Sequence, residues 1–265
     1  MSWWRWWRTL PQNPVYLREK GGWGKPNPFY DTLGRYSPFV VSGAILLGAC
    51  ASISNPALFA GSDALLAFYC LVCMPGILLN TVSMFGSLMA PALTAPSISM
   101  EMDRQTWDIL RVTPLSTRSI VMAKLIGGLS RLRIWSVLFV LSVLHGLIMA
   151  CSATFTGGSM AAWGLLIGAS TAVRPWLEVP FAAVVGMVAS TRVHSARTAL
   201  AASYTVVAMV RILNSSGLWL GIFSLFDLDD MLLVAASAGP VFVYILLLAG
   251  FGLTLMHQAD RLESV

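Results

Sequence analysis

Long apolar runs dominate this sequence and constrain its fold more than any other feature. Six runs follow one another along the chain: Phe39 to Ser54, Ala64 to Leu93, Ile120 to Ala153, Met160 to Ser190, Thr198 to Leu213 and Met231 to Met256. A helix needs about 20 apolar residues to cross the hydrocarbon layer of a bilayer. We therefore predict an all-α integral membrane protein with six transmembrane helices. Pro75 is predicted to kink the second run, and the segment Arg174 to Pro180 is predicted to interrupt the fourth.

The scarcity of charge supports the same fold class. Only 11% of the 265 residues are charged, whereas a soluble domain carries about a quarter. The runs and their connections use nearly the whole chain, so residues 1–265 are predicted to form a single transmembrane domain. A net charge of +5 does not indicate a nucleic-acid partner, because the basic residues lie at the ends of apolar runs. That position suits a membrane boundary.

The distribution of Lys and Arg predicts the orientation in the bilayer. All but Arg174 and Arg211 of the 17 basic residues, hence 15, fall in connections on one side of the six runs. Cytoplasmic loops carry this excess, so both termini are predicted to be cytoplasmic in a multi-pass protein of the plasma (inner) membrane. Residues 1–37 are predicted to form an interfacial segment that begins with a Trp-rich helix, and residues 257–265 a short tail.

No catalytic constellation, cofactor site or metal site is predicted in this chain. Its three histidines, His145, His194 and His257, lie far apart and lack ligand spacing. The sequence GGWGKP, residues 21–26, lacks the first glycine and the Ser/Thr of a phosphate-binding loop. The chain is therefore not expected to be an enzyme.

One charged segment, residues 99–114, separates the second and third runs. Pro96 and Pro114 enclose a predicted helix of about three turns. One side would carry Glu101, Arg104, Gln105, Asp108 and Arg111, and the other Met102, Thr106, Ile109, Leu110 and Thr113, with Trp107 at the edge. Asp103 and Val112 break this pattern. The segment predicts a short amphipathic helix on the cytoplasmic surface, which is either a solvated connector or a docking contact for a partner.

The sequence EMDRQTWDILRVTPLSTRSIVMAKL, residues 101–125, resembles the coupling-helix region of type-two ABC transporter permeases. The family pattern falls on Glu101, Arg104, Thr106, Asp108, Leu110, Pro114, Leu115, Ser116, Ile120 and Lys124. NPVYLRE, residues 13–19, is similar to the amphipathic start of such permeases. Residues 190–204 resemble their junction between spans four and five. The chain departs from the family at Gln105, where a Gly is usual, and in the Gly/Pro-rich segment that follows residue 19.

The resemblance implies a permease subunit of an ATP-driven transporter of the exporter type. Two six-span subunits, identical or different, would face each other, and each coupling helix would sit in a cleft of a separate cytoplasmic ATPase subunit. On this chain the ATPase contact would fall on Glu101, Arg104, Thr106, Trp107, Asp108, Leu110 and Pro114. The alternative is a non-transporting, permease-like structural subunit of a larger membrane complex, for example a bioenergetic one.

Two charges lie deep in the fourth run. Arg174 and Glu178 are four residues apart, one turn of helix, and charges at membrane depth pair with each other or face a cavity. They are predicted to form either a structural ion pair or part of a substrate path. Arg211, near the end of the fifth run, is expected to reach outward or to pair with the acidic residues at 227, 229 and 230.

Overall fold

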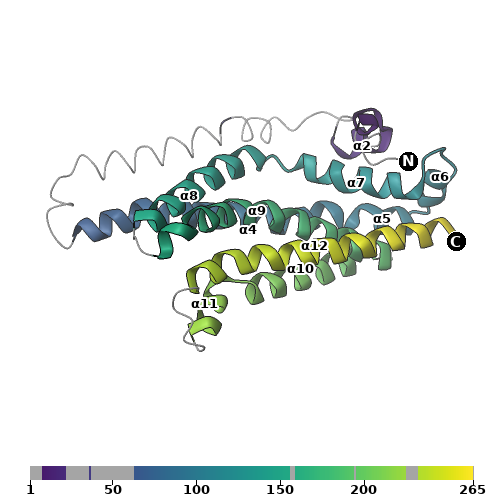
Figure 1. Ribbon diagram of the computed structural model, residues 1–265. Coiled ribbons are helices and arrows are strands. Elements are labelled where there is room, and N and C mark those ends of the chain that lie inside the picture. The colour runs from purple at the N-terminus through teal and green to yellow at the C-terminus, as the bar shows by residue number, and fades with distance from the viewer. Residues whose placement is uncertain are drawn as a thin grey trace.

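The computed structural model describes residues 8–21, 36, 63–155, 159–193, 195–224 and 232–264, and its regular structure in these ranges is helical, without strands. The elements are η1 (Leu10–Gln12), α2 (Pro14–Glu19), α4 (Asp63–Thr94), α5 (Pro96–Asp103), α6 (Trp107–Arg111), α7 (Thr117–Arg131), α8 (Trp135–Phe155), α9 (Ser159–Arg192), α10 (Ala196–Leu213), α11 (Ser216–Ser224) and α12 (Leu232–Ser264). The long helices run beside one another as an elongated bundle (Figure 1).

Four of the described helical segments are long and apolar enough to cross a membrane: Pro75–Asp103, Trp163–Arg192, Ala196–Leu213 and Val234–Leu262. A fifth results if α7 and α8 are counted as one bent span. This is the build of a multi-pass helical membrane protein, as the sequence predicts. The first predicted run, Phe39 to Ser54, and the Trp-rich start of the chain lie outside the described residues, so the number six stays a prediction.

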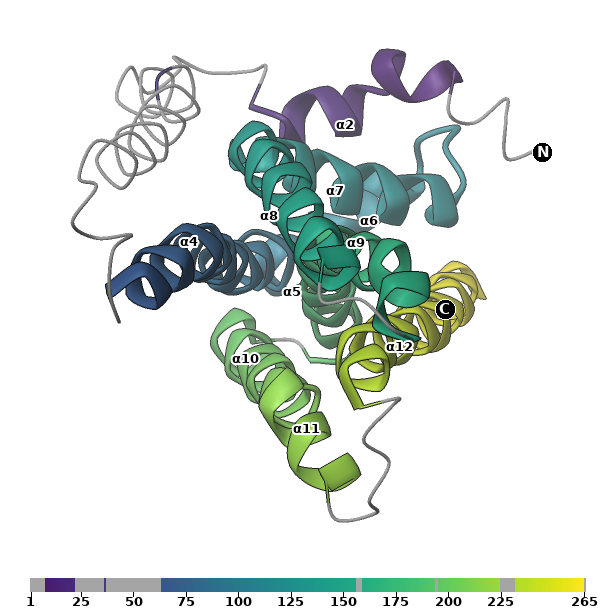
Figure 2. The ribbon, with the colours of Figure 1, turned by 60° about the vertical axis from the view of Figure 1, so that its left-hand side comes forward.

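Helix α9 is the axis of the bundle, with α4, α8, α10 and α12 packed around it (Figure 2). Its buried stretch runs from Val179 to Val188 and is rich in small side chains such as Ala182 and Ala183. Small residues let helix backbones approach closely. Gly186 illustrates this, because a Cβ atom there would collide with Thr94 and would lie 3.1 Å from the Cα of Pro91 on α4.

The predicted interruption of the fourth run at residues 174–180 is wrong. Helix α9 continues from Ser159 to Arg192 with Pro175 and Pro180 inside it. A proline removes one backbone hydrogen bond, but packing against neighbouring helices can keep a membrane helix continuous around it. Val179 and Phe181, beside the second proline, are almost fully buried in the bundle core.

The third predicted run is divided into two helices. α7 ends at Arg131 and α8 begins at Trp135, with a bend of 71° between them. Leu132 adopts an extended backbone conformation and is buried, and the indole of Trp135 donates to the Leu129 carbonyl at 2.9 Å. The same carbonyl accepts the Leu132 amide at 3.1 Å, so both residues of the bend are bonded to the end of α7. The basic first half of the run is thereby set at an angle to its apolar second half.

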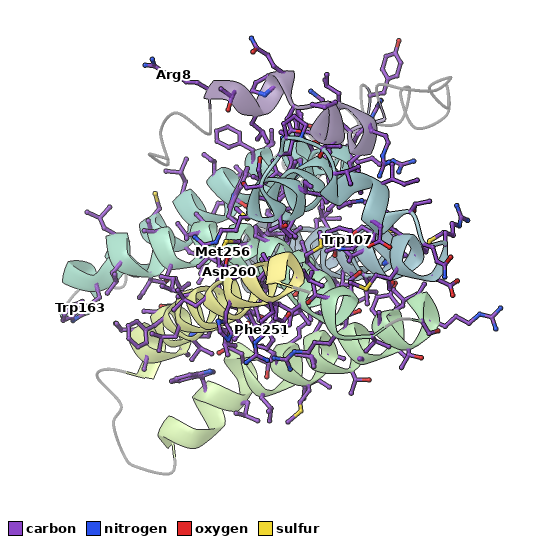
Figure 3. All side chains as sticks on the ribbon, turned by 90° about the vertical axis from the view of Figure 1, so that its right-hand side faces the viewer. Arg8, Trp107, Trp163, Phe251, Met256 and Asp260 are labelled. Atoms are coloured by element: carbon purple, nitrogen blue, oxygen red, sulfur yellow. The ribbon has the colours of Figure 1, made fainter. Side chains whose placement is uncertain are left out.

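α2, α6 and the C-terminal end of α12 lie at the same end of the bundle, which we call the α6 end (Figure 1). α2 packs on α7, where a Cβ atom at Gly127 would lie 2.6 Å from the Cβ of Glu19. Arg118 of α7 donates to Asp260 of α12, with Nη2 2.6 Å from Oδ2. Figure 3 views this end, with Trp107 and Asp260 labelled. The predicted tail is thus largely helical, because α12 extends to Ser264.

Candidate functional site

The predicted coupling helix over residues 99–114 is not one helix. α5 ends at Asp103, and α6 begins at Trp107 after a turn in which Gln105 has φ of 56°. Residues other than glycine rarely adopt this left-handed conformation. The turn is closed by the Thr106 amide, which donates to the Glu101 carbonyl at 2.9 Å. The single charged face predicted from the spacing is therefore broken at Gln105.

A buried lysine fixes α5 to the body of the molecule. The side chain of Lys124 on α7 is completely buried, and its ammonium lies 2.9 Å from Glu101 Oε1 and 3.1 Å from Glu19 Oε1. It also donates to the Ser97 carbonyl at 3.2 Å. Arg18 bonds both carboxylates from the solvent side. We call these four charged residues, Arg18, Glu19, Glu101 and Lys124, the anchor network, because they join α2, α5 and α7.

The anchor network stabilises the charged forms of Glu19 and Arg18. Burial by itself raises the pKa of Glu19, but the Lys124 ammonium and the Arg18 guanidinium outweigh it and hold that pKa below its usual range. Burial also lowers the pKa of Arg18, yet its bonds to Glu101 and Glu19 raise it above the ordinary value. Both shifts favour the charged forms of Glu19 and Arg18 at neutral pH.

Ser190 ties α5 to the central helix. Its hydroxyl, fully buried on α9, accepts hydrogen bonds from the amides of Ile98 at 3.0 Å and Ser99 at 2.9 Å. The first amides of a helix have no partner within it, so this hydroxyl replaces the missing carbonyls. One helical turn earlier, Thr94 donates to the Ala183 carbonyl of α9 at 2.9 Å. A displacement of α5 would thus act directly on α9.

The seven predicted coupling residues divide into two groups. Arg104, Thr106, Asp108 and Pro114 are exposed, whereas Glu101, Trp107 and Leu110 are buried or half-buried against the body. Trp107 packs in the main core. Sequence reasoning placed Ile109 on the apolar side and did not select it or Val112 as contacts, yet both project outward, 66% and 84% exposed. Exposed apolar and charged side chains therefore lie next to one another at α6.

The predicted intramembrane pair is present and has a third member. Arg174 Nε lies 2.8 Å from Glu178 Oε1, one turn apart on α9. Arg211 of α10 approaches the other oxygen, with Nη1 3.1 Å from Glu178 Oε2. The Glu178 side chain is only 5% exposed, while the two arginines are about one-fifth exposed. Arg211 therefore turns inward, and the acidic residues at 227, 229 and 230 lie outside the described residues.

Neutral polar groups complete the coordination of these three charges. Ser83 donates to Glu178, and Arg211 donates to Asn80 Oδ1 at 2.8 Å. Arg174 donates to Ser216 Oγ at 2.6 Å and to the Asn214 carbonyl at 3.1 Å. Ser87 of α4 lies 3.3 Å from Arg211 Nη1. The whole set, which we call the polar cluster, comprises Asn80, Ser83, Ser87, Arg174, Glu178, Arg211, Asn214 and Ser216.

The polar cluster connects α4, α9, α10 and α11 through one buried carboxylate. Its formal charge is +1, from two arginines and one glutamate. The Ser83 hydroxyl donates to Glu178, but the two oxygens of that carboxylate are already paired with Arg174 and Arg211. The chemistry of the cluster is that of charge pairing and hydrogen bonding. The spacing of Arg174 and Glu178 could be read from sequence, but the contribution of Arg211 from another helix could not.

Comparison of the chain with known protein families, with curated proteins and with solved structures found no match.

Proposed function

We propose that this chain is the membrane-spanning permease subunit of an ATP-driven ABC transporter of the exporter type, and that α6 is its contact with a separate ATPase subunit. The observation that carries the proposal is that α6 is exposed while the adjoining helix α5 is fixed to the body of the molecule. The short helix α6 presents Asp108 and Ile109 to solvent, and Val112 directly after it is also exposed, at one end of a bundle of apolar helices. The segment that bears it is fixed to α7 by Lys124 and to α9 by Ser190.

The conformation of Gln105 adds support. The permease family usually has Gly at this position, and here the residue has φ of 56°. A left-handed residue is the place where glycine is preferred, so the family's glycine and this turn fit the same geometry. The turn separates α5, which packs against the body, from α6, which is presented outward.

In this proposal the partner's motion reaches the membrane through α5 and α9. A force on α6 is transmitted to α5, and Ser190 passes it to the end of α9. α9 also carries Glu178 of the polar cluster, about 18 Å away along the helix at 1.5 Å per residue. ATP and Mg²⁺ would bind to the partner subunit, and a second permease subunit would complete the translocation path.

The test is purification of the full chain from its membrane in mild detergent, with every stoichiometric partner identified. We expect a partner that carries a phosphate-binding loop and whose ATPase activity rises on reconstitution with the chain. Arg104→Glu and Asp108→Lys should weaken this association, because both side chains are exposed, the first in the α5–α6 turn and the second on α6. Arg197→Glu, at an exposed position of α10, is the matched control and should leave the association intact.

A second candidate is a non-transporting structural subunit of a larger membrane complex. The polar cluster favours it, because the three charges are paired with one another and with hydroxyl and amide groups from four helices. Such a closed set would hold helices at fixed positions. Stoichiometric partners without any ATPase among them would support this candidate and contradict the permease proposal.

A further inference from the structure

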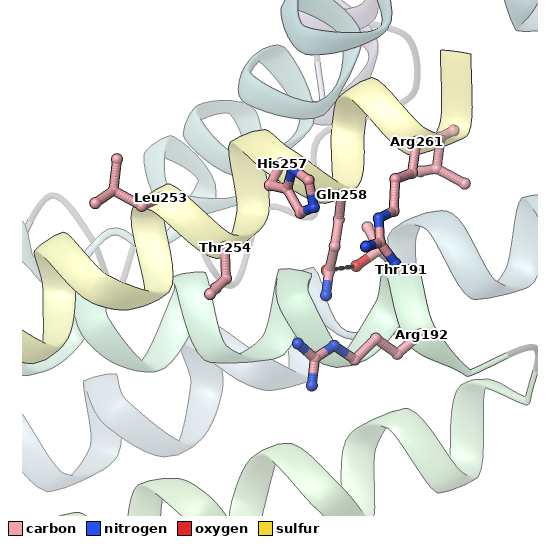
Figure 4. Close-up of a pocket in the computed structure, with 8 residues that line it drawn as sticks. Thr191, Arg192, Leu253, Thr254, His257, Gln258 and Arg261 are labelled. Carbon is pink, nitrogen blue, oxygen red and sulfur yellow. Dashed lines mark hydrogen bonds between the residues drawn. The ribbon is translucent and has the colours of Figure 1, made fainter. Parts of the chain in front are cut away.

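A groove lies between the ends of α9 and α12 at the α6 end (Figure 4). Its volume is about 600 Å³, within the range of ligand sites. The residues that matter here are Thr191 and Arg192 from α9, and Leu253, His257, Gln258 and Arg261 from α12. The groove is lined by no residue of the polar cluster and by none of α5 or α6. It therefore needs an explanation of its own.

The groove is basic. Arg192 and Arg261 line it together with His257, and its lining includes no acidic residue. The nearest carboxylate in the sequence, Asp260, is directed to Arg118 of α7, which bonds both of its oxygens. Both Asp260 oxygens are therefore engaged with α7 rather than in the groove. An anion placed between Arg192 and Arg261 would be attracted from both helices.

Gln258 holds Arg192 in place. The amide lies between Thr191 and Arg192, and one orientation satisfies all three groups: its nitrogen donates to Thr191 Oγ1 and its oxygen accepts from Arg192 Nη2 at 3.0 Å. Among the described residues Arg192 has no ion pair with an acid. Its guanidinium is thus positioned by a neutral group and keeps its full charge for a ligand.

An apolar stripe leads into this basic groove. Phe242, Leu246 and Leu253 of α12 are 62%, 56% and 73% exposed. Their spacing of four and seven residues places them on one side of the helix, and His257 and Arg261 continue the same row at intervals of four. The row changes from apolar to basic near the end of the membrane-length segment Val234–Leu262. An apolar row that ends in basic side chains matches a phospholipid, whose apolar acyl chain ends in an anionic headgroup.

We propose that the groove binds one anionic phospholipid, with the phosphate between Arg192 and Arg261 and an acyl chain along Phe242, Leu246 and Leu253. A lipid fits better than a soluble anion because the basic groove and the exposed apolar stripe are continuous. Basic pockets between membrane helices recognise phospholipid headgroups in this way. The site does not depend on the proposed transport function, since binding needs neither an ATPase nor a substrate.

The test is native mass spectrometry of the full chain in mild detergent with phosphatidylglycerol or phosphatidylcholine of equal chain length. We expect one phosphatidylglycerol to be retained in preference to phosphatidylcholine. Arg192→Gln or Arg261→Gln should each lower that preference about fivefold, the effect of one arginine near a membrane surface. Arg104→Gln and Arg197→Gln, at exposed positions outside the groove, should leave the preference unchanged.

Three results would overturn the proposal. Unchanged selectivity in the Arg192→Gln, Arg261→Gln double variant would show that the lipid binds elsewhere. Displacement of the lipid by inorganic phosphate alone would make the groove a site for soluble anions. A stoichiometric disulfide-linked dimer of the Leu253→Cys variant would make this face an interface between two copies. A double variant with lysine at both positions keeps the charge and should retain most of the selectivity, which separates charge loss from misfolding.

Discussion

At the scale of single residues, Glu178 is the group on which the buried charges depend. It is the only carboxylate in the polar cluster and bonds both Arg174 and Arg211. Removing one partner from a buried ion pair costs about 3–5 kcal/mol, because the remaining charge stays buried without compensation. The cost should be largest for Glu178, since its loss leaves two arginines facing each other.

We predict that Glu178→Gln destabilises the protein by about 3–5 kcal/mol, more than Arg174→Gln or Arg211→Gln. Either arginine variant leaves one Arg–Glu pair, whereas the glutamate variant leaves two like charges. The measurement is equilibrium unfolding in mixed micelles at neutral pH. Combining Glu178→Gln with Arg211→Gln should recover part of the loss. Equal losses for the three single variants would contradict this account of the cluster.

A second residue-scale prediction concerns pH. The pKa of Glu19 is lower in the folded chain than in the unfolded chain, because Lys124 and Arg18 outweigh the effect of burial. Its ionised form therefore contributes stability above the unfolded value of about 4.3, and this contribution is lost as the pH falls through the folded pKa. Glu19→Gln should flatten the decline in unfolding free energy between about pH 5 and the folded pKa.

The control for this pH dependence is Asp103→Asn, at an exposed carboxylate of α5 outside the anchor network. Unfolding in mixed micelles should show the full acid decline in the control. A Glu19→Gln profile that falls as steeply as that of the unaltered chain would show that the anchor network does not contribute in this way.

At the scale of elements, the crossing of α8 and α9 depends on two glycines. Gly146 of α8 faces Gly168 of α9, and a Cβ atom at Gly146 would lie 2.8 Å from the Gly168 carbonyl oxygen. Real Cβ atoms do not approach so closely, so a side chain there must push the helices apart. Small residues at such a crossing allow the backbones to meet.

We predict that Gly146→Leu destabilises the α8–α9 crossing by about 1–3 kcal/mol, the usual cost of overpacking. Gly250→Leu on α12 is the matched control, because a Cβ atom there meets nothing within 4 Å. Thermal unfolding in detergent measures both variants. The control should unfold at the same temperature as the unaltered chain or above it, since leucine favours helix over glycine. Similar losses in the two variants would contradict the close crossing.

The turn between α5 and α6 gives a further prediction at this scale. Gln105 occupies a left-handed conformation that costs other residues about 1–2 kcal/mol relative to glycine. Replacing Gln105 by glycine would remove this cost, but part of the stabilisation is offset because glycine also increases the conformational entropy of the unfolded chain. Gln105→Gly should therefore stabilise the chain by about 0.5–1 kcal/mol, and Gln105→Val should destabilise it. Thermal unfolding in detergent that ranks valine equal to glycine would show that the turn opens in solution.

These elements also show what the sequence could predict. Hydrophobic runs located α4, α9, α10 and α12, because apolar length is a strong signal for membrane helices. Charge spacing located the Arg174–Glu178 pair but wrongly joined α5 and α6, since a spacing of three or four residues does not detect a turn. Asp103 and Val112, which broke the pattern, were the available signal. The partners of Lys124 and Arg211 come from distant segments, and one sequence does not indicate such contacts.

At the scale of the whole molecule, α9 connects the two candidate regions. Its end receives α5 through Ser190, and its middle holds Glu178 of the polar cluster. A bundle built on one central helix can transmit a displacement from one end to the other, because packed helices shift as units rather than deform. The permease proposal needs a defined orientation, with the α6 end on the cytoplasmic side.

We predict that the α6 end faces the cytoplasm, because its connections carry most of the basic residues of the chain. Arg104→Cys, Arg197→Cys and Gly217→Cys place a thiol at exposed positions of the α5–α6 turn, α10 and α11. A membrane-impermeant maleimide should label the first two only in inside-out vesicles. It should label the third only in right-side-out vesicles, since α11 lies at the opposite end of the bundle (Figure 1). The unaltered chain, with its four cysteines, serves as the background. The reverse pattern would place α6 outside the cell, beyond the reach of a cytoplasmic ATPase, and the permease proposal would fail with it.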